Sequence, residues 1–333
     1  MENSLPFVSI LIAARNESEN ILACLRAMEK LDYPKGMFDV WIGNDASEDD
    51  TFSKVQMYVE GKPGFHLVDI HEQLGKAKGK ANVLAQLAKK AKGEFFLFTD
   101  ADVEVPASWA TDMVNVAQKG YGVVTGFTMI RSNMLWGKLQ AVDWLYAQQM
   151  IKIVSDLGLP VTSMGNNMLL SRKAYFAVGG YESLPFSIIE DYAMFKAVVG
   201  KGFRFKNIMQ TGVMAFTQPI EGLLSLLHQR KRWMKGAMKL PFYMLVVLFL
   251  QALYFPAILF FSFVNFELAL LVFILKTGIQ ALVIGSGLVR FGQWRNMVAL
   301  LFYEPYVMVL SFLMVIFYFL PIKVIWKGRV YER

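Results

Sequence analysis

Gly93-Glu94-Phe95-Phe96-Leu97-Phe98-Thr99-Asp100-Ala101-Asp102 is the stretch that decides the fold. Its run of apolar residues leads directly into two aspartates that are separated by one residue. Such a run predicts a strand buried on both faces of a parallel sheet. Ligands of open α/β sheets bind beyond the carboxyl ends of the strands, which is where Asp100 and Asp102 fall. Two carboxylates without a nearby thiol or imidazole suit Mg²⁺ or Mn²⁺ held together with substrate phosphates. Taken alone, this short motif also fits two solvated aspartates in a turn.

Strand and helix patterns alternate on both sides of this stretch. We predict strands at 7–14, 38–43, 65–70 and 122–127, and helices at 21–28, from 51, and at 80–92, 108–119 and 135–155. A strand and a short helix follow at 165–178, and another helix starts near 190. Alternation of this kind indicates βαβ units. The predicted fold class is therefore α/β, with a mostly parallel central sheet flanked by helices.

Composition separates a soluble part from an apolar part. The chain has 333 residues, of which 55% are hydrophobic. Between Leu240 and Val289 the only charged residues are Glu267 and Lys276. The net charge of +7 suggests anionic lipid headgroups or a phosphorylated substrate. No nucleic-acid reader motif is present, so we expect no nucleic-acid partner.

Two further features concern the cellular location. Cys24 is the only cysteine, which excludes an internal disulfide and a cysteine-based metal site. The first residues, Met1–Pro6, have neither a basic nor an apolar region of a signal peptide. We therefore expect the first domain to stay in the cytoplasm.

A basic amphipathic helix is predicted just before the apolar part. Leu223, Leu227, Met234 and Met238 fall on one side, and His228, Lys231, Arg232, Lys235 and Lys239 fall on the other. This pattern is typical of a helix that lies in the membrane interface. A surface helix of a soluble domain is the alternative.

Three apolar stretches follow, Leu240–Val264, Leu268–Val289 and Val298–Pro321, and each is long enough to span a membrane. The number of crossings stays open at two or three. Three crossings would place the basic tail, with Lys323, Lys327, Arg329 and Arg333, outside, against the positive-inside rule. Pro256 and Pro305 offer places for a kinked or re-entrant segment.

Lys276 lies near the middle of the second stretch, where an ammonium is costly unless it is paired or hydrated. Glu304 in the third stretch is the obvious partner, and snorkelling of the lysine to the interface is the alternative. We expect a contact between these two residues.

Several short motifs, taken together and in order, resemble the family 2 inverting glycosyltransferases of the GT-A fold. The resemblance covers about residues 7–239. Its motifs are Val8–Glu17, Asn44-Asp45-Ala46-Ser47, Gly75–Asn82, Asp100-Ala101-Asp102, Glu190-Asp191 and Gln229-Arg230-Lys231-Arg232-Trp233. Asn44 departs from the family pattern, in which an aspartate opens the nucleotide turn. The implied architecture is a catalytic domain at 1–219, an interfacial helix at 220–239 and a membrane region at 240–333.

The resemblance implies a role for each matching residue. Asp191, with Glu190, would act as the general base, and Asp102, with Asp100, would hold the metal and the diphosphate. The UDP-sugar would be bound by Ala14, Asn16, Glu17, Asp45, Lys80, Asp100, Gln229 and Arg232. The acceptor would be contacted by Trp233, Asn166 and Asn167. Position alone also allows Trp233 to be a membrane anchor, and Lys80 to belong to a solvated lysine run.

The chemistry agrees with these roles. Inverting transfer needs a base for the acceptor hydroxyl and positive charge on the departing diphosphate. Phosphatases with an aspartyl nucleophile also carry Asp-x-Asp after a strand, but their motif continues with Thr or Val where this chain has Glu104. A non-enzymatic membrane scaffold is disfavoured because both acidic motifs are intact.

The acceptor is the open question. Gln-x-x-Arg-Trp occurs in processive polysaccharide synthases and in lipid glucosyltransferases of the ceramide and carotenoid types. Three C-terminal apolar stretches are few for a polymer-conducting pore, so we favour transfer of one sugar to a membrane lipid. The expected location is the cell (inner) membrane, with several crossings and the catalytic domain facing the cytoplasm.

Overall fold

The phenylalanine-rich stretch forms β4 (Phe95–Asp100) at the centre of a seven-stranded sheet. The strand order is β3-β2-β1-β4-β7-β5-β8. The other strands are β1 (Val8–Ala14), β2 (Phe38–Asn44), β3 (Phe65–Asp69), β5 (Tyr121–Thr125), β7 (Asn167–Ser171) and β8 (Arg204–Asn207). β7 alone runs antiparallel to its neighbours β4 and β5. The prediction of an α/β fold with a mostly parallel sheet is confirmed.

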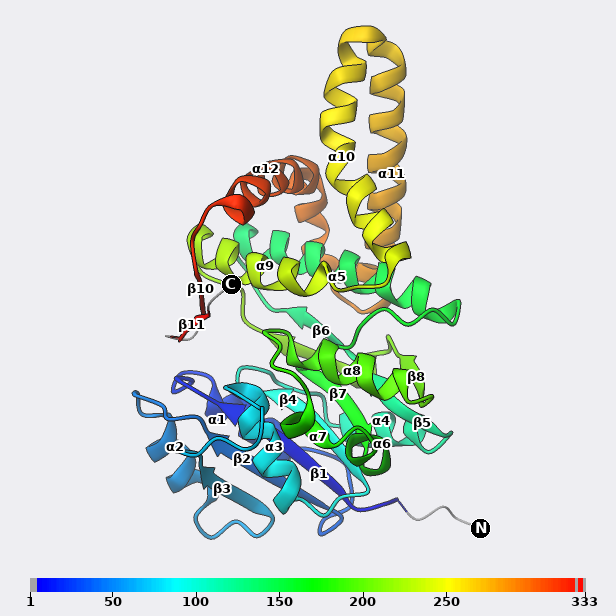
Figure 1. Ribbon diagram of the computed structural model, residues 1–333. Helices are drawn as coiled ribbons and strands as arrows, with labels where there is room; N and C mark the ends of the chain where they lie inside the picture. Colours follow the sequence, from blue (N-terminus) through cyan, green and yellow to red (C-terminus); the bar gives the residue numbers. More distant parts are fainter. Residues whose placement is uncertain (1–4, 327–328, 332–333) are drawn as a thin grey trace. The chain divides into compact units, whose positions relative to one another are not determined.

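The computed structural model describes residues 5–326 and 329–331 (Figure 1). The chain forms two compact units. Unit 1 comprises residues up to 129 together with 154–217, and unit 2 comprises 130–153 together with 218–333. Residues 130–153, which the sequence analysis assigned to the first domain, thus group with the apolar C-terminal part.

Helices cover both faces of the sheet in unit 1. α1 (Ile21–Glu29) and α2 (Thr51–Val59) connect strands that step outward from β1 to β3. α3 (Lys80–Lys90) then returns from β3 to β4. Because parallel crossovers are right-handed, the change of direction puts α3 on the face opposite to α1 and α2. The direction reverses between β1 and β4, and ligands of such sheets generally bind beyond the strand ends at this point.

The face under α3 carries a large apolar core. It joins α3 to β4 through Phe96 and Phe98, whose side chains are fully buried. The remaining helices of unit 1 are α4 (Trp109–Ala117), α6 (Arg172–Ala177), α7 (Gly180–Ser183) and α8 (Glu190–Gly200). In Figure 1, α3 and α7 lie side by side, in agreement with their contacts. Tyr175 and Met194 bring α6 and α8 into the same core.

A second, two-stranded sheet lies beyond β4. It consists of β6 (Phe127–Ile130) and β9 (Met214–Thr217), with the short 3₁₀ helix η1 (Thr211–Val213) just before β9. Glu104 and Phe216 form an antiparallel bridge with reciprocal backbone hydrogen bonds of 2.8 Å. This bridge brings the end of β9 to the residues that follow β4.

Unit 2 consists mainly of helices. They are α5 (Leu135–Asp156, in this unit up to residue 153), α9 (Leu223–Ala237), α10 (Phe242–Val264), α11 (Phe266–Arg290), the 3₁₀ helix η2 (Trp294–Ala299) and α12 (Leu300–Phe319). A hairpin of β10 (Val324–Trp326) and β11 (Arg329–Tyr331) follows. Lys327 and Arg333 of the basic tail, and Met1–Ser4, lie outside the described residues.

The predicted apolar stretches form long helices. Among the described residues, three helical segments are long and apolar enough to cross a membrane: Phe242–Val264, Phe266–Arg290 and Trp294–Phe319. α10 and α11 pack side by side as an antiparallel pair (Figure 1). Asn265 between them caps α11, since its side chain accepts a 3.0 Å hydrogen bond from the Leu268 N–H. Pro256 and Pro305 lie inside α10 and α12 without ending either helix.

Candidate active site

Three neighbouring strands of unit 1 end at the same edge of the sheet. The register pairs Ala14 with Asn44, and Ala13 with Asp100, so the first residues after β1, β2 and β4 gather there. Asp45 follows β2 directly, and its N–H donates to the Ala14 carbonyl at 2.8 Å. The parallel register therefore brings together motifs that are far apart in the sequence.

Lys80 lies between two acidic motifs. Its ammonium, at the start of α3, is 2.5 Å from Asp100 Oδ1 and 3.0 Å from Glu190 Oε1. Burial lowers the pKa of Lys80, but the charges of Asp100 and Glu190 outweigh burial and hold this pKa above its usual value. Asp100 and Glu190 thus form an acidic cluster with Lys80 as its fixed cation, and Lys80 is not part of a solvated lysine run.

Asp102 has a different environment. The hydroxyl of Thr217, at the end of β9, donates to Asp102 Oδ2 at 3.4 Å. Burial, and next the charge of Asp100, raise the pKa of Asp102 to about 6. Carboxylates that repel one another in this way gain from a shared divalent cation.

The donor set suits a metal that is completed by a ligand. In the part of the chain that the structure describes, no group of three or more His, Cys, Asp or Glu side chains is placed to hold a metal ion. Asp100 and Asp102 therefore fit Mg²⁺ or Mn²⁺ only with oxygens from elsewhere, such as a diphosphate.

Asp191 occupies the first turn of α8 and is held by backbone donors. Gly165 N–H donates to its Oδ2 at 2.7 Å, and Tyr192 N–H donates to its Oδ1 at 2.8 Å. Ser163 Oγ donates to the Asp191 carbonyl at 3.1 Å, which fixes the start of the helix. Burial, and next the charge of Glu190, raise the pKa of Asp191 to about 6. A carboxylate of this kind is oriented, ionised near neutral pH, and basic enough to take up a proton.

The turns after β1 and β2 hold one another. Asn16 and Ala46 both adopt left-handed backbone conformations, with φ of 51° and 50°. The Asn16 N–H donates to Ser47 Oγ, and Asn16 Oδ1 accepts from the Glu48 N–H at 2.8 Å. Arg15 Nη1 donates to the Asp45 carbonyl at 2.7 Å. These bonds shape a tight double turn that includes the backbone of Asp45.

Two polar residues in this region are tied into the fold. Glu17 is almost fully buried, its N–H donates to Thr51 Oγ1 at 2.7 Å, and its carboxylate accepts from Asn20. The Asn44 side chain donates to Asp69 Oδ1 at 2.7 Å. An aspartate at position 44 would face the Asp69 carboxylate, which explains in physical terms why this chain has an amide there.

The two asparagines proposed as acceptor contacts differ. Asn166 is partly exposed, and its Oδ1 accepts from Thr128 Oγ1 at 3.2 Å. Asn167 is fully buried: its Oδ1 accepts from Trp109 Nε1, and its Nδ2 donates to the carbonyls of Phe127 and Val213. These bonds leave Asn167 no surface for an acceptor, so this assignment is corrected to a structural one.

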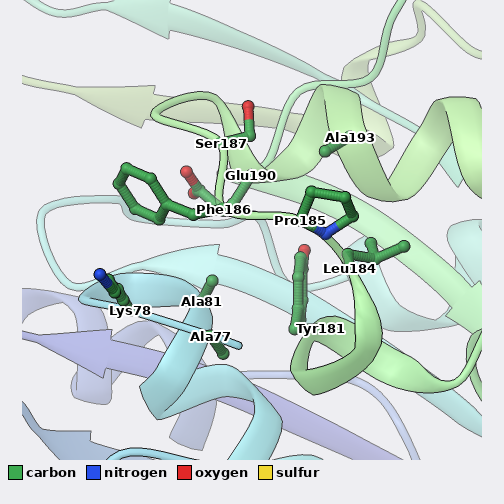
Figure 2. A pocket seen from close by; sticks show the side chains of 10 residues that line it. All are labelled: Ala77, Lys78, Ala81, Tyr181, Leu184, Pro185, Phe186, Ser187, Glu190 and Ala193. Carbon is green, nitrogen blue, oxygen red and sulfur yellow. The ribbon is translucent and has the colours of Figure 1, made fainter. Parts of the chain in front are cut away.

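A pocket opens beside the acidic cluster, between the start of α3 and the segment joining α7 to α8. Figure 2 shows Phe186 and Lys78 on one side of it, and Tyr181 and Leu184 on the other. The Lys78 ammonium lies 5.9 Å from the Phe186 ring centroid. Glu190 lines the pocket and also pairs with Lys80, so this side chain links the pocket to the acidic cluster.

Gln229, Arg232 and Trp233 belong to α9 in unit 2 and are described there by themselves. Trp233 stacks on Trp144 of α5, with ring centroids 4.6 Å apart. The neighbouring Arg230 lies over the Trp233 ring and forms a 2.5 Å ion pair with Asp143 of α5. The helix that carries the Gln-x-x-Arg-Trp motif, α9 (the motif helix), therefore packs against α5, and Trp233 contacts protein within its own unit.

The predicted polar side of α9 requires a correction. His228 and Lys231 were placed on that side, yet both are buried, whereas Leu223 and Met238 are exposed. Lys231 is buried because its ammonium donates to the carbonyls of Phe317 and Leu320, at 2.9 and 2.8 Å, where α12 ends. A cation at a helix C-terminus satisfies carbonyls that have no partner within the helix.

Sequence reasoning missed several residues of the site, namely Arg15, Gly165, Thr217, Tyr181 and Phe186. Thr217 and Gly165 belong to none of the motifs. Each is far in the sequence from its partner, Asp102 or Asp191, and only folding brings the two together. Arg15 belongs to the motif Val8–Glu17, in the turn after β1. Its guanidinium donates to the carbonyls of Asp45 and Ala46 in the turn after β2, and a contact between these two turns could have been expected.

Comparison with known proteins places this α/β chain among the glycosyltransferases. The sequence profile described as glycosyl transferase family 21 matches residues 1–332, and the chain belongs to that family. The motifs had suggested family 2; both descriptions are of glycosyltransferases.

Curated relatives include a lipid glucosyltransferase and a polysaccharide synthase. The chain is 27% identical over 251 residues to a beta-monoglucosyldiacylglycerol synthase of Trichormus variabilis. This alignment covers 71% of this chain and 50% of that protein. It is 29% identical over 237 residues to a poly-beta-1,6-N-acetyl-D-glucosamine synthase of Staphylococcus aureus, which covers 70% and 55%. The chain spans about half the length of these relatives.

A solved structure shares the fold. The mannosyltransferase of Pyrobaculum calidifontis, in complex with GDP-Man and Mn²⁺, aligns with a TM-score of 0.56 and 20% identity. The alignment covers 92% of this chain and 88% of that one. The likeness establishes the fold and extends over most of both chains.

Proposed function

We propose that this protein is a metal-dependent inverting glycosyltransferase that moves a sugar from a UDP-sugar to a hydroxyl of a membrane lipid. The observation that carries the proposal is the carboxylate of Asp191, which is fixed by two backbone N–H groups and has a pKa raised to about 6. A base in this state can remove the proton of an acceptor hydroxyl as its oxygen attacks the anomeric carbon.

The leaving diphosphate requires positive charge. Mg²⁺ or Mn²⁺ held by Asp100 and Asp102 supplies such charge when it is bound. Lys80 adds a fixed ammonium beside Asp100, and its second partner, Glu190, links it to the segment that carries the base. Arg232 of α9 is proposed as a further diphosphate contact and Gln229 as a donor contact, both from the motif alone.

The donor would lie along the edge formed by β1, β2 and β4. Ala14, Asn16, Glu17 and Asp45 shape the nucleotide end of this edge, and the carboxylate of Asp45 suits the N–H or hydroxyl donors of a uridine. This choice of UDP rests on the motif Asn44–Ser47.

A lipid acceptor is supported by the architecture of unit 2. The helix that bears Gln229 and Trp233 leads within a few residues into α10, the first of the described helices that is both long and apolar enough to cross a membrane. The glucosyldiacylglycerol synthase among the relatives uses a lipid, by its name. We propose a multi-pass protein of the inner membrane whose catalytic domain faces the cytoplasm, where nucleotide sugars are made.

The test is sugar transfer by membranes that contain the protein. Labelled UDP-glucose, UDP-N-acetylglucosamine and UDP-galactose are supplied separately with Mg²⁺ or Mn²⁺, and the products are partitioned between organic solvent and water. We expect label in the organic phase, reduced about a hundredfold or more by Asp191→Asn. Transfer that persists undiminished in Asp191→Asn would reject Asp191 as the base.

Polysaccharide synthesis is the second candidate, because one relative is named as a poly-beta-1,6-N-acetyl-D-glucosamine synthase. It predicts label in large water-soluble or insoluble material. The same partition therefore separates the two candidates.

A further inference from the structure

A polar cluster lies among the three membrane-type helices of unit 2. Lys276 of α11 pairs with Glu304 of α12, with 2.5 Å between Nζ and Oε1, which bears out the expected contact. Gln280, one turn further along α11, donates to Glu304 Oε2 at 3.3 Å. The Lys276 ammonium also lies 4.7 Å from the ring centroid of Tyr254 and 5.4 Å from that of Phe255, both on α10. The cluster thus draws on all three helices.

The cluster contains hydroxyl groups that the protein leaves unused. The oxygens of Tyr254 and Thr277 are buried, and neither makes a hydrogen bond with any residue that the structure describes. Thr277 precedes Gln280 by three positions, so these two residues are neighbours on the surface of α11. A buried hydroxyl without a partner costs about 1–3 kcal/mol. Two of them beside an intramembrane ion pair point to a ligand.

Both oxygens of the carboxylate in the cluster are already in use, whereas the two hydroxyl hydrogens are not, which bears on the chemistry of that ligand. Lys276, Gln280, Tyr254 and Thr277 all offer hydrogens, whereas the one carboxylate, Glu304, already accepts from Lys276 and Gln280. An acceptor oxygen on the ligand would satisfy these hydroxyl hydrogens. The charges of Lys276 and Glu304 cancel, so the cluster favours a neutral carbonyl over an anionic phosphate.

We propose that this cluster binds the ester or amide carbonyl of a neutral lipid, and this proposal rests on the proposed lipid acceptor. Lys276 lies near the middle of α11 (Phe266–Arg290), at a depth that a lipid without a charged headgroup can reach more easily than a phospholipid headgroup. The carbonyl oxygen accepts hydrogen bonds from the hydroxyl groups of Tyr254 and Thr277.

The cluster is connected to the motif helix of the same unit. Tyr303, which precedes Glu304 on α12, donates to Asp143 at 3.1 Å, and Asp143 pairs with Arg230 of α9. Arg230 lies between Gln229 and Trp233 in the motif. A lipid held at the cluster is therefore next to helices that also position the transferase motif.

The experiment measures binding without depending on catalysis. The full-length Asp191→Asn protein is placed in phosphatidylcholine vesicles and labelled with a diacylglycerol that carries a photoreactive acyl chain. Unlabelled dioleoylglycerol, or its dialkyl ether analogue without carbonyls, competes for labelling, and labelled peptides are mapped by mass spectrometry. The measured quantity is the ratio of the ether to the ester concentration that halves labelling of α10–α12.

We expect the ester to compete several-fold better than the ether, about two- to tenfold for each hydrogen bond. Replacing Tyr254 by Phe and Thr277 by Val together brings the ratio to about one. Because these hydroxyl groups bond to no described residue, the replacements are expected to leave the protein folded. Ser262→Ala is the matched control, since the Ser262 hydroxyl donates within α10 to the Leu259 carbonyl, and it leaves the ratio unchanged.

Three outcomes would overturn the proposal: no labelling of α10–α12, equal competition by ester and ether, or a ratio that survives loss of both hydroxyl groups. Failure of the proposed function appears elsewhere, as the absence of lipid-bound sugar from the active protein. Ester-selective labelling without such transfer would uphold the site and reject the function.

Discussion

The backbone N–H of Gly165 donates a 2.7 Å hydrogen bond to the Asp191 carboxylate, and the two residues are in close contact. A Cβ added to Gly165 would lie 2.8 Å from Asp191 Cβ and 2.9 Å from its Oδ2. Gly165→Ala must therefore displace the proposed base. We expect kcat to fall about tenfold to a hundredfold, because misplacement by about 1 Å is enough for such a loss.

Gly200→Ala is the control for this substitution. Gly200 ends α8, the helix that begins with Glu190 and Asp191, and a Cβ added to Gly200 would meet nothing within 4 Å. We expect unchanged kcat and a slight gain in stability. Equal activity of Gly165→Ala and wild type would show that Asp191 is not the base.

The pH dependence of activity tests the charges around Asp191. Burial raises its pKa to about 6, and the charge of Glu190 adds to the effect of burial. Since a base works only when deprotonated, kcat/KM should rise with pH, with a midpoint near 6. Glu190→Gln removes a negative charge, lowers the pKa of Asp191, and should move the midpoint to lower pH.

Lys80→Met should have the opposite effect. The Lys80 charge lowers the pKa of Asp191, so its loss should raise the midpoint. Both profiles are measured at saturating Mg²⁺, which keeps Asp102 ionised. Shifts of both variants in one direction would contradict this assignment of charges.

The sequence predicted most of the sheet edge because its residues follow buried strands. Asp45, Asp100 and Asp102 were placed by the rule that ligands bind beyond the carboxyl ends of parallel strands, and the register of β1, β2 and β4 brings their ends together. The antiparallel insertion of β7 and the pairing of β6 with β9 were not foreseen. Both depend on contacts between distant segments, and short apolar runs do not encode the direction of pairing.

Asn167 shows how a resemblance can mislead. The resemblance implied acceptor contacts for Asn166 and Asn167, yet of these two only Asn166 is partly exposed. Asn167 is the first residue of β7, whose first four residues are all buried, whereas Asn166 lies just before the strand. The buried Asn167 satisfies the indole of Trp109 and two backbone carbonyls.

Asn167→Ala should therefore affect stability. The substitution leaves buried groups without partners, which we expect to cost about 2–4 kcal/mol. Thermal unfolding in detergent should show a drop of several degrees, whereas KM for the acceptor, measured where the variant is folded, should stay unchanged. Asn166→Ala, with one side-chain hydrogen bond at 3.2 Å, should have the smaller thermal effect. An increased acceptor KM in Asn167→Ala at full stability would restore the original assignment.

Lys231 tests how α9 is anchored to α12. Lys231→Met keeps the length of the side chain but removes the donor to the Phe317 and Leu320 carbonyls. Hydrogen bonds from a charged donor contribute about 1.5–3 kcal/mol, so the melting temperature should fall. Lys235→Met, on the same helix and partly exposed, should melt like the wild type. Equal melting of the two variants would show that the cap at α12 contributes nothing to stability.

The ion pair Lys276–Glu304 predicts that each single variant is less stable than the double variant. Lys276→Met alone leaves the Glu304 carboxylate, which is 8% exposed, without its cation, and Glu304→Gln alone leaves the ammonium without its anion. Either loss should lower the stability of the detergent-solubilised protein by about 1–3 kcal/mol, below the value for a fully buried pair because Lys276 is 29% exposed. The double variant should be close to wild type, since no buried charge then lacks a partner. Thermal melting of all four proteins gives the coupling free energy, and additive losses would show that the two side chains do not interact.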